Sequence, residues 1–515
     1  MRGKYMQNVQ DTYKSAQEKN IMAAKAITET VRSTLGPAGM DKLMMDAGGN
    51  VIVTNDGATI LQELDVAHPG AEMIIEAANM QESLCYDGTT STVVLAGQLL
   101  ENTQGLFNKG IHPNIICRGY RQANRWAIAH LDTLKINANE HLHSVAQTSI
   151  TGKSLESAME HVSSICVSAV ETVEGDYDRI RVLCQPGGSV DDSYCFNGVI
   201  LHKEFMLPSM QSKPKGNVLL VNTGLEADKI EDNLQVQFKS AQELQSYRQQ
   251  TSREVWVQMA EQISSLLPKG GVLLVRDSVN ETLAAMLARK DISIAQRLPP
   301  SDLTAISHLL STKVAHSIED ISEPSKAIVE QKTIGDMDYI VIESNEDSNV
   351  STLVLRGATK QTLDETERGF EDALGVVSLA YSSGEIVAGG GSAYISMAQH
   401  LRQRAAEVGG RQQMAVEAFA DALEIIPATI AENAGHDPLD TILALRSEHI
   451  NGSVSHGPNI EEGGVIDMLS LGVLEPLSLI RQCLNSASEV SISILRIDDI
   501  FGRKTEGGNP QPPGM

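Results

Sequence analysis

Several residue classes are scarce in this sequence of 515 residues. No run of about 18 consecutive apolar residues occurs, so we expect no membrane-spanning helix and no membrane partner. The N-terminal stretch MRGKYMQNVQDTYKS lacks the apolar segment of a secretory signal, which predicts a cytoplasmic protein. Aromatic residues make up only 4% of the chain, so Val, Ile, Leu, Ala and Met have to fill its cores.

Cysteines and positive charges are also few. The cysteines form no C-x-x-C pair, and six of them in so long a chain are expected to be reduced and mostly buried rather than a disulfide framework. The net charge of −25 argues against a nucleic-acid groove or an anionic membrane surface as the main partner. The scattered cysteines are Cys85, Cys117, Cys166, Cys184, Cys195 and Cys483.

The length and the hydrophobic pattern predict a multidomain protein. A chain of 515 residues with 42% apolar and 21% charged residues is a globular protein of two to four domains. Helical periodicity at both ends and strands alternating with helices in the middle predict an inserted α/β unit. Helices are expected at 10–35, from Ile60 to about 135, and at 155–174, 239–267 and 360–383. Strands are expected at Lys42–Asp46, Val51–Thr54, Arg181–Cys184, Val199–Phe205, Asn217–Val221, Gly271–Val275 and Ile492–Ile497.

A carboxylate, a glycine and three hydroxyls precede one buried helix. They form the segment Asp87-Gly88-Thr89-Thr90-Ser91, which the apolar run 92–100 follows. A helix N-terminus offers free backbone N–H groups and the positive end of the dipole, which suit phosphate oxygens. Two interpretations of Asp87 are open: an ordinary N-cap, or a ligand that holds Mg²⁺ beside a bound phosphate.

Four segments of small residues, three of them with an acid, resemble the chaperonins of group II, the type of the archaeal thermosome and the eukaryotic cytosolic chaperonin. The segments are LGPAGMDK at 35–42, TNDGATIL at 54–61, DGTTS at 87–91 and AGGGS at 388–392. The resemblance extends from about residue 10 to 503 and also rests on ERGFEDAL at 367–374, AENAGHDPLD at 431–440, VLEPL at 473–477 and ILRIDDI at 494–500.

The resemblance implies binding and hydrolysis of ATP with Mg²⁺. Asp87 would ligate the metal, Asp56 would sit at the γ-phosphate and the attacking water, and Asp372 would orient and activate that water. Without the resemblance, Asp56-Gly57 is an ordinary turn, and Asp372 is a surface acid opposite the apolar stripe of its helix. The implied nucleotide-binding set is Leu35, Gly36, Pro37, Asp56, Gly57, Asp87, Gly88, Thr89, Thr90, Ser91, Gly390 and Glu475.

The resemblance also implies the domain organisation and the partners. A mainly helical equatorial domain (1–141 and 388–515) would bind ATP, and a mixed intermediate domain (142–209 and 350–387) would act as a hinge. An inserted α/β apical domain (210–349) would bind non-native proteins, with SAQELQSYRQQ at 240–250 as its helical lid protrusion. Copies of the chain or paralogous subunits would form two stacked rings.

Several residues depart from the family pattern around the phosphates. Tyr86 stands where a glycine is usual, and Ala38 where a lysine is usual. Ser157, Met159 and His161 follow T-G-K where lysines often occur. These departures support an alternative, a weakly hydrolysing structural subunit of a mixed ring. A small-molecule kinase with the same phosphate loops is a second alternative.

Overall fold

The computed structural model describes residues 2–45, 49, 51–66, 68–226, 241–320, 324–335, 337–344 and 348–498. The chain divides into two compact units. The first unit comprises Met1–Met159 and Glu371–Met515, and the second comprises Glu160–Phe370. Within the described residues, none of the helices combines the length and the hydrophobicity needed to cross a membrane.

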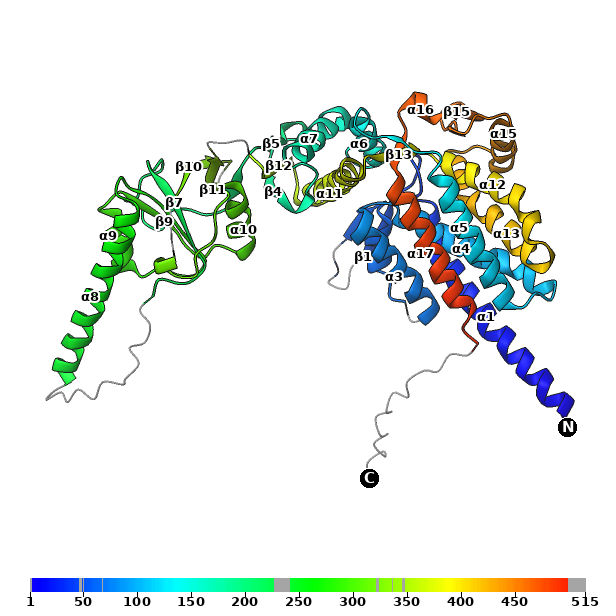
Figure 1. The fold of residues 1–515 in the computed structure, drawn as a ribbon, viewed down its shortest axis with the longest axis horizontal. Helices are drawn as coiled ribbons and strands as arrows, with labels where there is room; N and C mark the ends of the chain where they lie inside the picture. Colours follow the sequence, from blue (N-terminus) through cyan, green and yellow to red (C-terminus); the bar gives the residue numbers. More distant parts are fainter. Residues whose placement is uncertain are drawn as a thin grey trace. The chain divides into compact units, whose positions relative to one another are not determined.

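The first unit is built mainly from helices (Figure 1). Its helices are α1 (Arg2–Arg32), α2 (Gly57–Gln62), α3 (Pro69–Cys85), α4 (Thr89–Asn108), α5 (Pro113–Leu131), α6 (Leu142–Ile150), α12 (Ser392–Val408), α13 (Gly410–Leu423), α14 (Ile425–Asn433), α15 (Pro438–Ile450), α16 (Met468–Leu471) and α17 (Leu477–Leu495). Its strands are β1 (Lys42–Met45), β2 (Val51–Thr54), β3 (Ile136–Asn137), β13 (Glu385–Ala388), β14 (His456–Pro458), β15 (Val465–Asp467) and β16 (Leu474–Pro476).

Helix α4 is the buried centre of this unit. It packs against α1, α3, α13 and α17, and its side chains from Val93 to Ala96 are fully buried. At Gly97 a Cβ atom would lie 2.0 Å from Oγ1 of Thr28, so only glycine lets α1 approach this closely. Because α4 is held on several sides, its N-terminus is a fixed point from which the Asp87 segment can be positioned.

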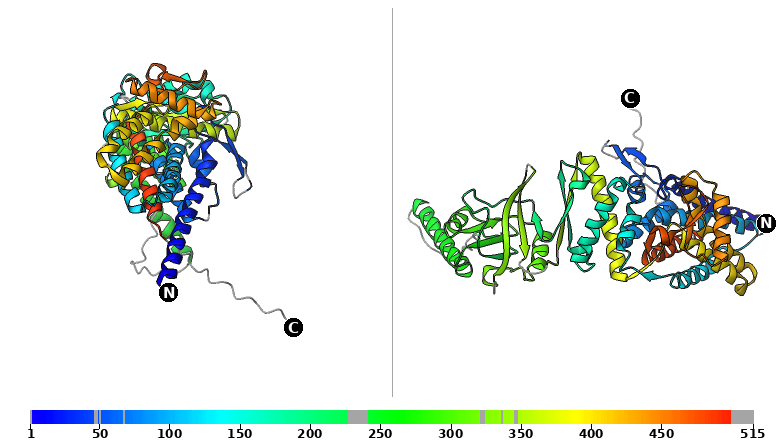
Figure 2. Two further views of the ribbon diagram at one scale, coloured as in Figure 1. Left: turned by 90° about the vertical axis from the view of Figure 1, so that its right-hand side faces the viewer. Right: turned by 90° about the horizontal axis from the view of Figure 1, so that it is seen from above.

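The predicted hairpin forms and stands off from the helices of its unit (Figure 2). Strands β1 and β2 pair antiparallel, with Lys42 opposite Thr54 and Met45 opposite Val51. Leu43 and Met45 are 74% and 69% exposed, so the hairpin presents apolar side chains to its surroundings. Of the predicted turn, Gly48 and Asn50 lie outside the described residues.

The second unit contains two sheets with their helices. A six-stranded sheet has the order β6-β11-β10-β7-β8-β9, and a three-stranded sheet has the order β4-β12-β5. Its strands are β4 (Ile180–Pro186), β5 (Tyr194–Phe196), β6 (Val199–Leu201), β7 (Asn217–Val221), β8 (Gly271–Val275), β9 (Ile292–Ala295), β10 (Ser325–Ile334), β11 (Met337–Ser344) and β12 (Ser351–Gly357). Its helices are α7 (Met159–Thr172), α8 (Ala241–Leu266), α9 (Glu281–Ala288), α10 (Pro300–Leu309) and the first part of α11 (Lys360–Ser383), which ends in the first unit.

The parallel strands β7, β8 and β9 are mostly apolar and almost entirely buried, as expected for a sheet covered on both faces. The predicted α/β unit in the middle of the chain is therefore present. The backbone of the predicted protrusion is helical from Ala241, within α8, while residue 240 and the side chains of 241–250 lie outside the described part of the structure.

Most predicted elements are confirmed, and one strand is wrong. Residues 360–383 form a single helix that stops at Gly384, whose φ of 67° ends it in the left-handed region. The predicted strand Ile492–Ile497 is instead the last part of α17, which is helical to Leu495. The sequence Val490-Ser491-Ile492-Ser493-Ile494 alternates as a strand would, although these residues are helical and Ser491, Ile492 and Ile494 are all buried. All six cysteines are free, and four of them are buried.

Candidate nucleotide site

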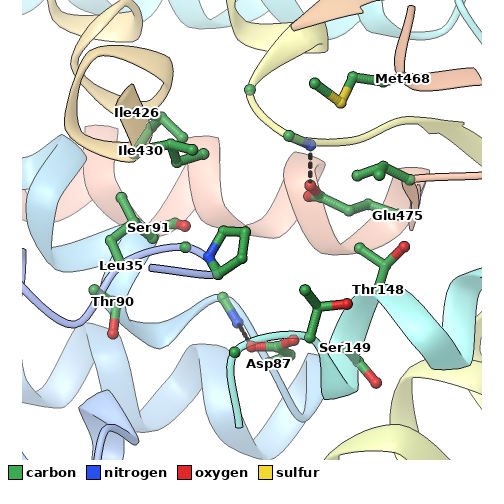
Figure 3. Close-up of a pocket in the computed structure, with 18 of the residues that line it drawn as sticks. Leu35, Asp87, Thr90, Ser91, Thr148, Ser149, Ile426, Ile430, Met468 and Glu475 are labelled. Carbon is green, nitrogen blue, oxygen red and sulfur yellow. Dashed lines mark hydrogen bonds between the residues drawn. The ribbon is translucent and has the colours of Figure 1, made fainter. Parts of the chain in front are cut away.

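One pocket of about 510 Å³ in the first unit brings together segments that lie far apart in the sequence. Its volume suits a small-molecule ligand. Figure 3 shows Leu35, Asp87 and Glu475 around it, with Ile426 and Ile430 from α14 on another wall. Every residue of the predicted nucleotide-binding set lines this pocket. Asp372 does not line the pocket. It accepts a hydrogen bond from Lys153, and Lys153 is a lining residue.

Three loops meet on one side of the pocket. The loop after α1 carries Gly36, whose φ of 84° lies in the left-handed region that favours glycine. A Cβ on Gly152 would lie 2.7 Å from Cα of Pro37, so the loop after α6 packs directly on the loop after α1. The Asn55 side chain donates a hydrogen bond of 2.7 Å to the carbonyl oxygen of Gly152. These contacts fix Lys153, the next residue, at the pocket wall.

Asp87 is not the N-cap of α4, so this alternative from the sequence is wrong. The cap is Gly88, in the left-handed region at φ 85°, and no side chain caps the helix there. Oδ1 of Asp87 accepts a hydrogen bond of 2.7 Å from the backbone N–H of Gly88, which turns the carboxylate beside the helix start (Figure 3). The pocket therefore has a helix N-terminus with a carboxylate next to it.

Asp56, in contrast, is the N-cap of α2. Its Oδ1 accepts from the N–H of Ala58 at 3.2 Å, and its Oδ2 accepts from the N–H and the hydroxyl of Thr59 at 2.8 and 2.7 Å. Helix α2 therefore begins at Gly57 rather than at Ile60. A Cβ on Gly57 would lie 2.3 Å from Oγ1 of Thr90, so glycine is needed where this loop touches the start of α4.

Lys153 and Asp372 form an ion pair, with 2.6 Å between Nζ and Oδ2. Burial raises the pKa of Asp372 to about 7 against the opposing effect of Lys153, and the charges of Asp87 and Asp56 add to the rise. Burial disfavours the charged form of Lys153, but attraction to Asp372 and Asp87 outweighs it and raises the lysine pKa. Lys153 thus stays protonated and links Asp372 to the pocket.

Another wall of the pocket, across from the Asp87 segment, is built on the triple glycine. The backbone N–H of Gly390 donates to Oε1 of Glu475 at 3.0 Å (Figure 3). A Cβ on Gly389 would lie 2.7 Å from the same oxygen, and one on Gly391 would lie 2.8 Å from Cβ of Pro427. Burial raises the pKa of Glu475 to about 7, with a further contribution from Asp87. This wall needs glycines because a carboxylate and α14 lie against its backbone.

The sequence matches the TCP-1/cpn60 chaperonin family over residues 27–505. The chain belongs to this family. It is 38% identical to a thermosome subunit of Methanopyrus kandleri, over 95% of this chain and 92% of that protein. It is 40% identical to thermosome subunit alpha of Halobacterium salinarum, over 94% of this chain and 88% of the relative. With thermosome subunit beta of Archaeoglobus fulgidus, identity is 37%, over 97% and 96% of the two chains.

The pocket of this chaperonin is poor in positive charge. Among the described residues that line the pocket, Lys153 has the only basic side chain, beside the acids Asp56, Asp87, Glu461, Glu462 and Glu475. His161 binds the carbonyl oxygen of Ser193 at 2.9 Å, within the second unit. The sequence motifs alone do not assign Lys153 to the site, although the T-G-K sequence at 151–153 is a signal for it.

Glu82, near the end of α3, is a further acid of this region that the motifs do not include. Burial raises its pKa to about 9, and Asp372, Asp56 and Asp87 add to the rise. Glu82 is therefore protonated at neutral pH in the folded chain and ionised in the unfolded one. The folded state loses stability as pH rises above the unfolded value of about 4.5, because folding must then take up a proton.

The Glu82→Gln variant is accordingly expected to be more stable than the parent chain at pH 7. We expect its thermal unfolding midpoint to rise by about 2 °C or more, and the difference to shrink as pH falls toward 4.5. Glu76→Gln, on an exposed part of α3, is the matched control and should leave the midpoint unchanged. A lower midpoint for Glu82→Gln at pH 7 would show that this carboxylate is ionised and paired.

Proposed function

We propose that this group II chaperonin subunit binds ATP with Mg²⁺ in the pocket and hydrolyses it to drive a protein-folding cycle. The observation that carries the proposal is the meeting of the α4 N-terminus, Asp87 and the Lys153–Asp372 pair at one cavity. Hydrolysis of ATP requires charge neutralisation and a positioned water rather than covalent chemistry by the protein. These groups meet both requirements.

The phosphate end of ATP would lie at the start of α4. The backbone N–H groups of Thr89, Thr90 and Ser91 belong to the first turn, where they have no intrahelical partner and suit phosphate oxygens. The lining supplies one lysine against five acids, which would repel a polyphosphate that carried no cation. Among the described residues no cluster of three or more His, Cys, Asp or Glu side chains could hold a metal ion.

The single carboxylate of Asp87 at the start of α4 fits Mg²⁺, which is usually held by one or two carboxylates together with substrate phosphates. Asp87 would hold the ion, and the bound ion would neutralise negative charge on the β- and γ-phosphates. The hydrogen bond from the N–H of Gly88 to Oδ1 holds this carboxylate beside the start of α4. The single carboxylate beside free N–H groups is therefore a suitable half-site, which the nucleotide would complete.

Asp372 would accept the proton of the attacking water and hold that water in line with the γ-phosphate. Lys153 would keep Asp372 at the pocket and place one positive charge near the phosphates. Asp56 would stand near the γ-phosphate, although both of its oxygens also cap α2. The adenosine end would contact Ile426, Ile430 and other apolar side chains, and Glu475 would approach the ribose.

Assembly into rings is supported by exposed apolar side chains in the first unit. Besides the β1–β2 hairpin, Leu439, Leu443 and Ile450 of α15 are 66%, 51% and 70% exposed. Such patches are typical of protein interfaces. We propose an equatorial domain of 1–141 and 388–515, an intermediate domain of 142–209 and 350–387, and an apical domain of 210–349 that binds non-native proteins.

Turnover of MgATP by the purified full chain, measured together with its particle size, tests this function. We expect ring-sized particles in native mass measurements, lid closure with ATP in negative-stain images, and hydrolysis well above that of Asp372→Ala. Turnover equal to that of Asp372→Ala would favour the weakly hydrolysing structural subunit. Hydrolysis by a monomer would contradict the ring assembly.

The pH dependence of kcat/KM is expected to report Asp372 in the free enzyme. Its carboxylate must be ionised to accept a proton, and its pKa is about 7. We therefore expect kcat/KM to be level at high pH and to fall tenfold per unit of pH below about 7, a limb that Asp372→Asn should lack. A profile that is flat down to pH 5 would contradict a raised pKa at this acid.

A further inference from the structure

Tyr86 occupies a backbone conformation that favours glycine. It ends α3 with φ 61° and ψ −2°, in the left-handed region, and its N–H donates to the carbonyl oxygen of Glu82 at 2.8 Å. This conformation costs free energy for any residue other than glycine. Of the described non-glycine residues with positive φ, Tyr86 alone is aromatic. Its side chain must therefore make a contact that offsets this cost.

The Tyr86 ring packs on Gly375, a buried glycine inside α11. A Cβ at Gly375 would lie 2.0 Å from Cγ of Tyr86 and 2.4 Å from its Cβ and Cδ2. Glycine inside a helix is less favourable than alanine. Tyr86 is unfavourable at the end of α3, and Gly375 is unfavourable inside α11. They meet, and the absence of a side chain on Gly375 leaves room for the Tyr86 ring.

This contact lies between two acids of the proposed reaction. Asp87 is the next residue after Tyr86, and Asp372 stands one turn before Gly375 on the same side of α11. Asp372 is also held by Lys153 at 2.6 Å. The ring on Gly375 is therefore a second support for the turn of α11 that carries Asp372, and it comes from the loop that carries Asp87.

We propose that Tyr86 is a positioning residue, whose ring on Gly375 sets the separation between the Asp87 loop and the Asp372 turn of α11. The inference rests on the proposed hydrolysis of ATP. Positioning of this kind acts on the chemical step, since small displacements of a group that orients water lower the rate steeply. It leaves nucleotide binding nearly unchanged, because Tyr86 is not among the residues that line the pocket.

Four variants of the full chain test the positioning role by steady-state MgATP hydrolysis. Tyr86→Gly removes the ring and suits the left-handed backbone, so it should fold, and we expect kcat to fall about tenfold with KM within twofold. Tyr86→Phe keeps the ring and should retain kcat within twofold. Gly375→Ala should lower kcat about tenfold by displacing the ring, while Tyr86→Gly/Gly375→Ala should be no slower than Tyr86→Gly, because no ring remains to be displaced.

Hydrogen exchange of the nucleotide-free assembled chain gives a readout that does not depend on hydrolysis. Backbone amides of 372–379 should exchange at least fivefold faster in Tyr86→Gly than in the parent chain, and at the parent rate in Tyr86→Phe. Amides of α15 serve as the control for a general loss of stability and should be unchanged.

The outcomes separate the inference from the proposed function. A parent chain that hydrolyses ATP no faster than Asp372→Ala would overturn the proposed function, and the exchange rates would still decide whether Tyr86 holds α11. Parent-like kcat and parent-like exchange in Tyr86→Gly would overturn the positioning role. An equal decrease of kcat in Tyr86→Phe and Tyr86→Gly would also overturn the positioning role, since the ring, which Tyr86→Phe retains, would then not be responsible for the effect.

Discussion

Replacing Asp87 by Asn is expected to lower kcat/KM for MgATP by about 10³-fold. The reason is that a bound Mg²⁺ contributes several kcal/mol of charge stabilisation, and about 1.4 kcal/mol corresponds to a factor of ten. The amide keeps the shape of the carboxylate and removes its charge, so the loss reports the cation rather than the packing. The measurement is steady-state hydrolysis over a range of Mg²⁺ concentrations.

Two controls sharpen the Asp87 result. Asp65→Asn removes an exposed acid that does not line the pocket and should leave kcat/KM unchanged. In Asp87→Asn, high Mg²⁺ should recover part of the activity by mass action, whereas a merely structural defect would not respond to the ion. Hydrolysis by Asp87→Asn within threefold of the parent rate would remove Asp87 from the metal site.

For Asp372→Asn, kcat is expected to fall by about 10² to 10⁴-fold, the range of a lost general base. The KM for MgATP should stay within a few-fold, because Asp372 does not line the pocket and contacts it through Lys153. Single-turnover hydrolysis after rapid mixing, together with nucleotide binding by calorimetry, separates the chemical step from binding.

The matched control for Asp372 is its exposed neighbour on α11. Glu371→Gln removes one negative charge from the same helix turn and should leave kcat within twofold. If Asp372→Asn instead weakened nucleotide binding and left the single-turnover rate unchanged, Asp372 would be an anchor for Lys153 and not the group that activates water.

Local patterns were sufficient to predict much of the fold. The strands β7 and β8 each contain the run Val-Leu-Leu-Val, which is buried on both faces of the sheet and therefore lacks the polar positions of a half-exposed strand. Helix α11 shows a clear apolar stripe and a glycine stop, so its bounds of 360–383 were predicted as observed. The last turns of α17 instead alternate as Val490-Ser491-Ile492-Ser493-Ile494, which is the pattern of a strand, and there the prediction of a strand was wrong.

For the candidate site, the individual motifs could be predicted from the sequence, but the contacts between them could not. A short segment such as 87–91 contains both the glycine that shapes the loop and the groups that we propose to bind phosphate, so it can be recognised from the sequence alone. What no local pattern contains is the pairing of distant segments. The contact of Lys153 with Asp372, 219 residues apart, exists only because the loop after α6 packs on Pro37.

The difference between Asp56 and Asp87 has the same cause. In sequence each acid precedes a glycine and a helix, and both could be N-caps. The folded chain makes Asp56 the cap of α2 and gives the cap position of α4 to Gly88. Residue types and spacing thus establish the family and the chemical groups. Which carboxylate remains beside the helix start, and which acid Lys153 holds, depends on backbone geometry and on contacts between segments far apart in the chain.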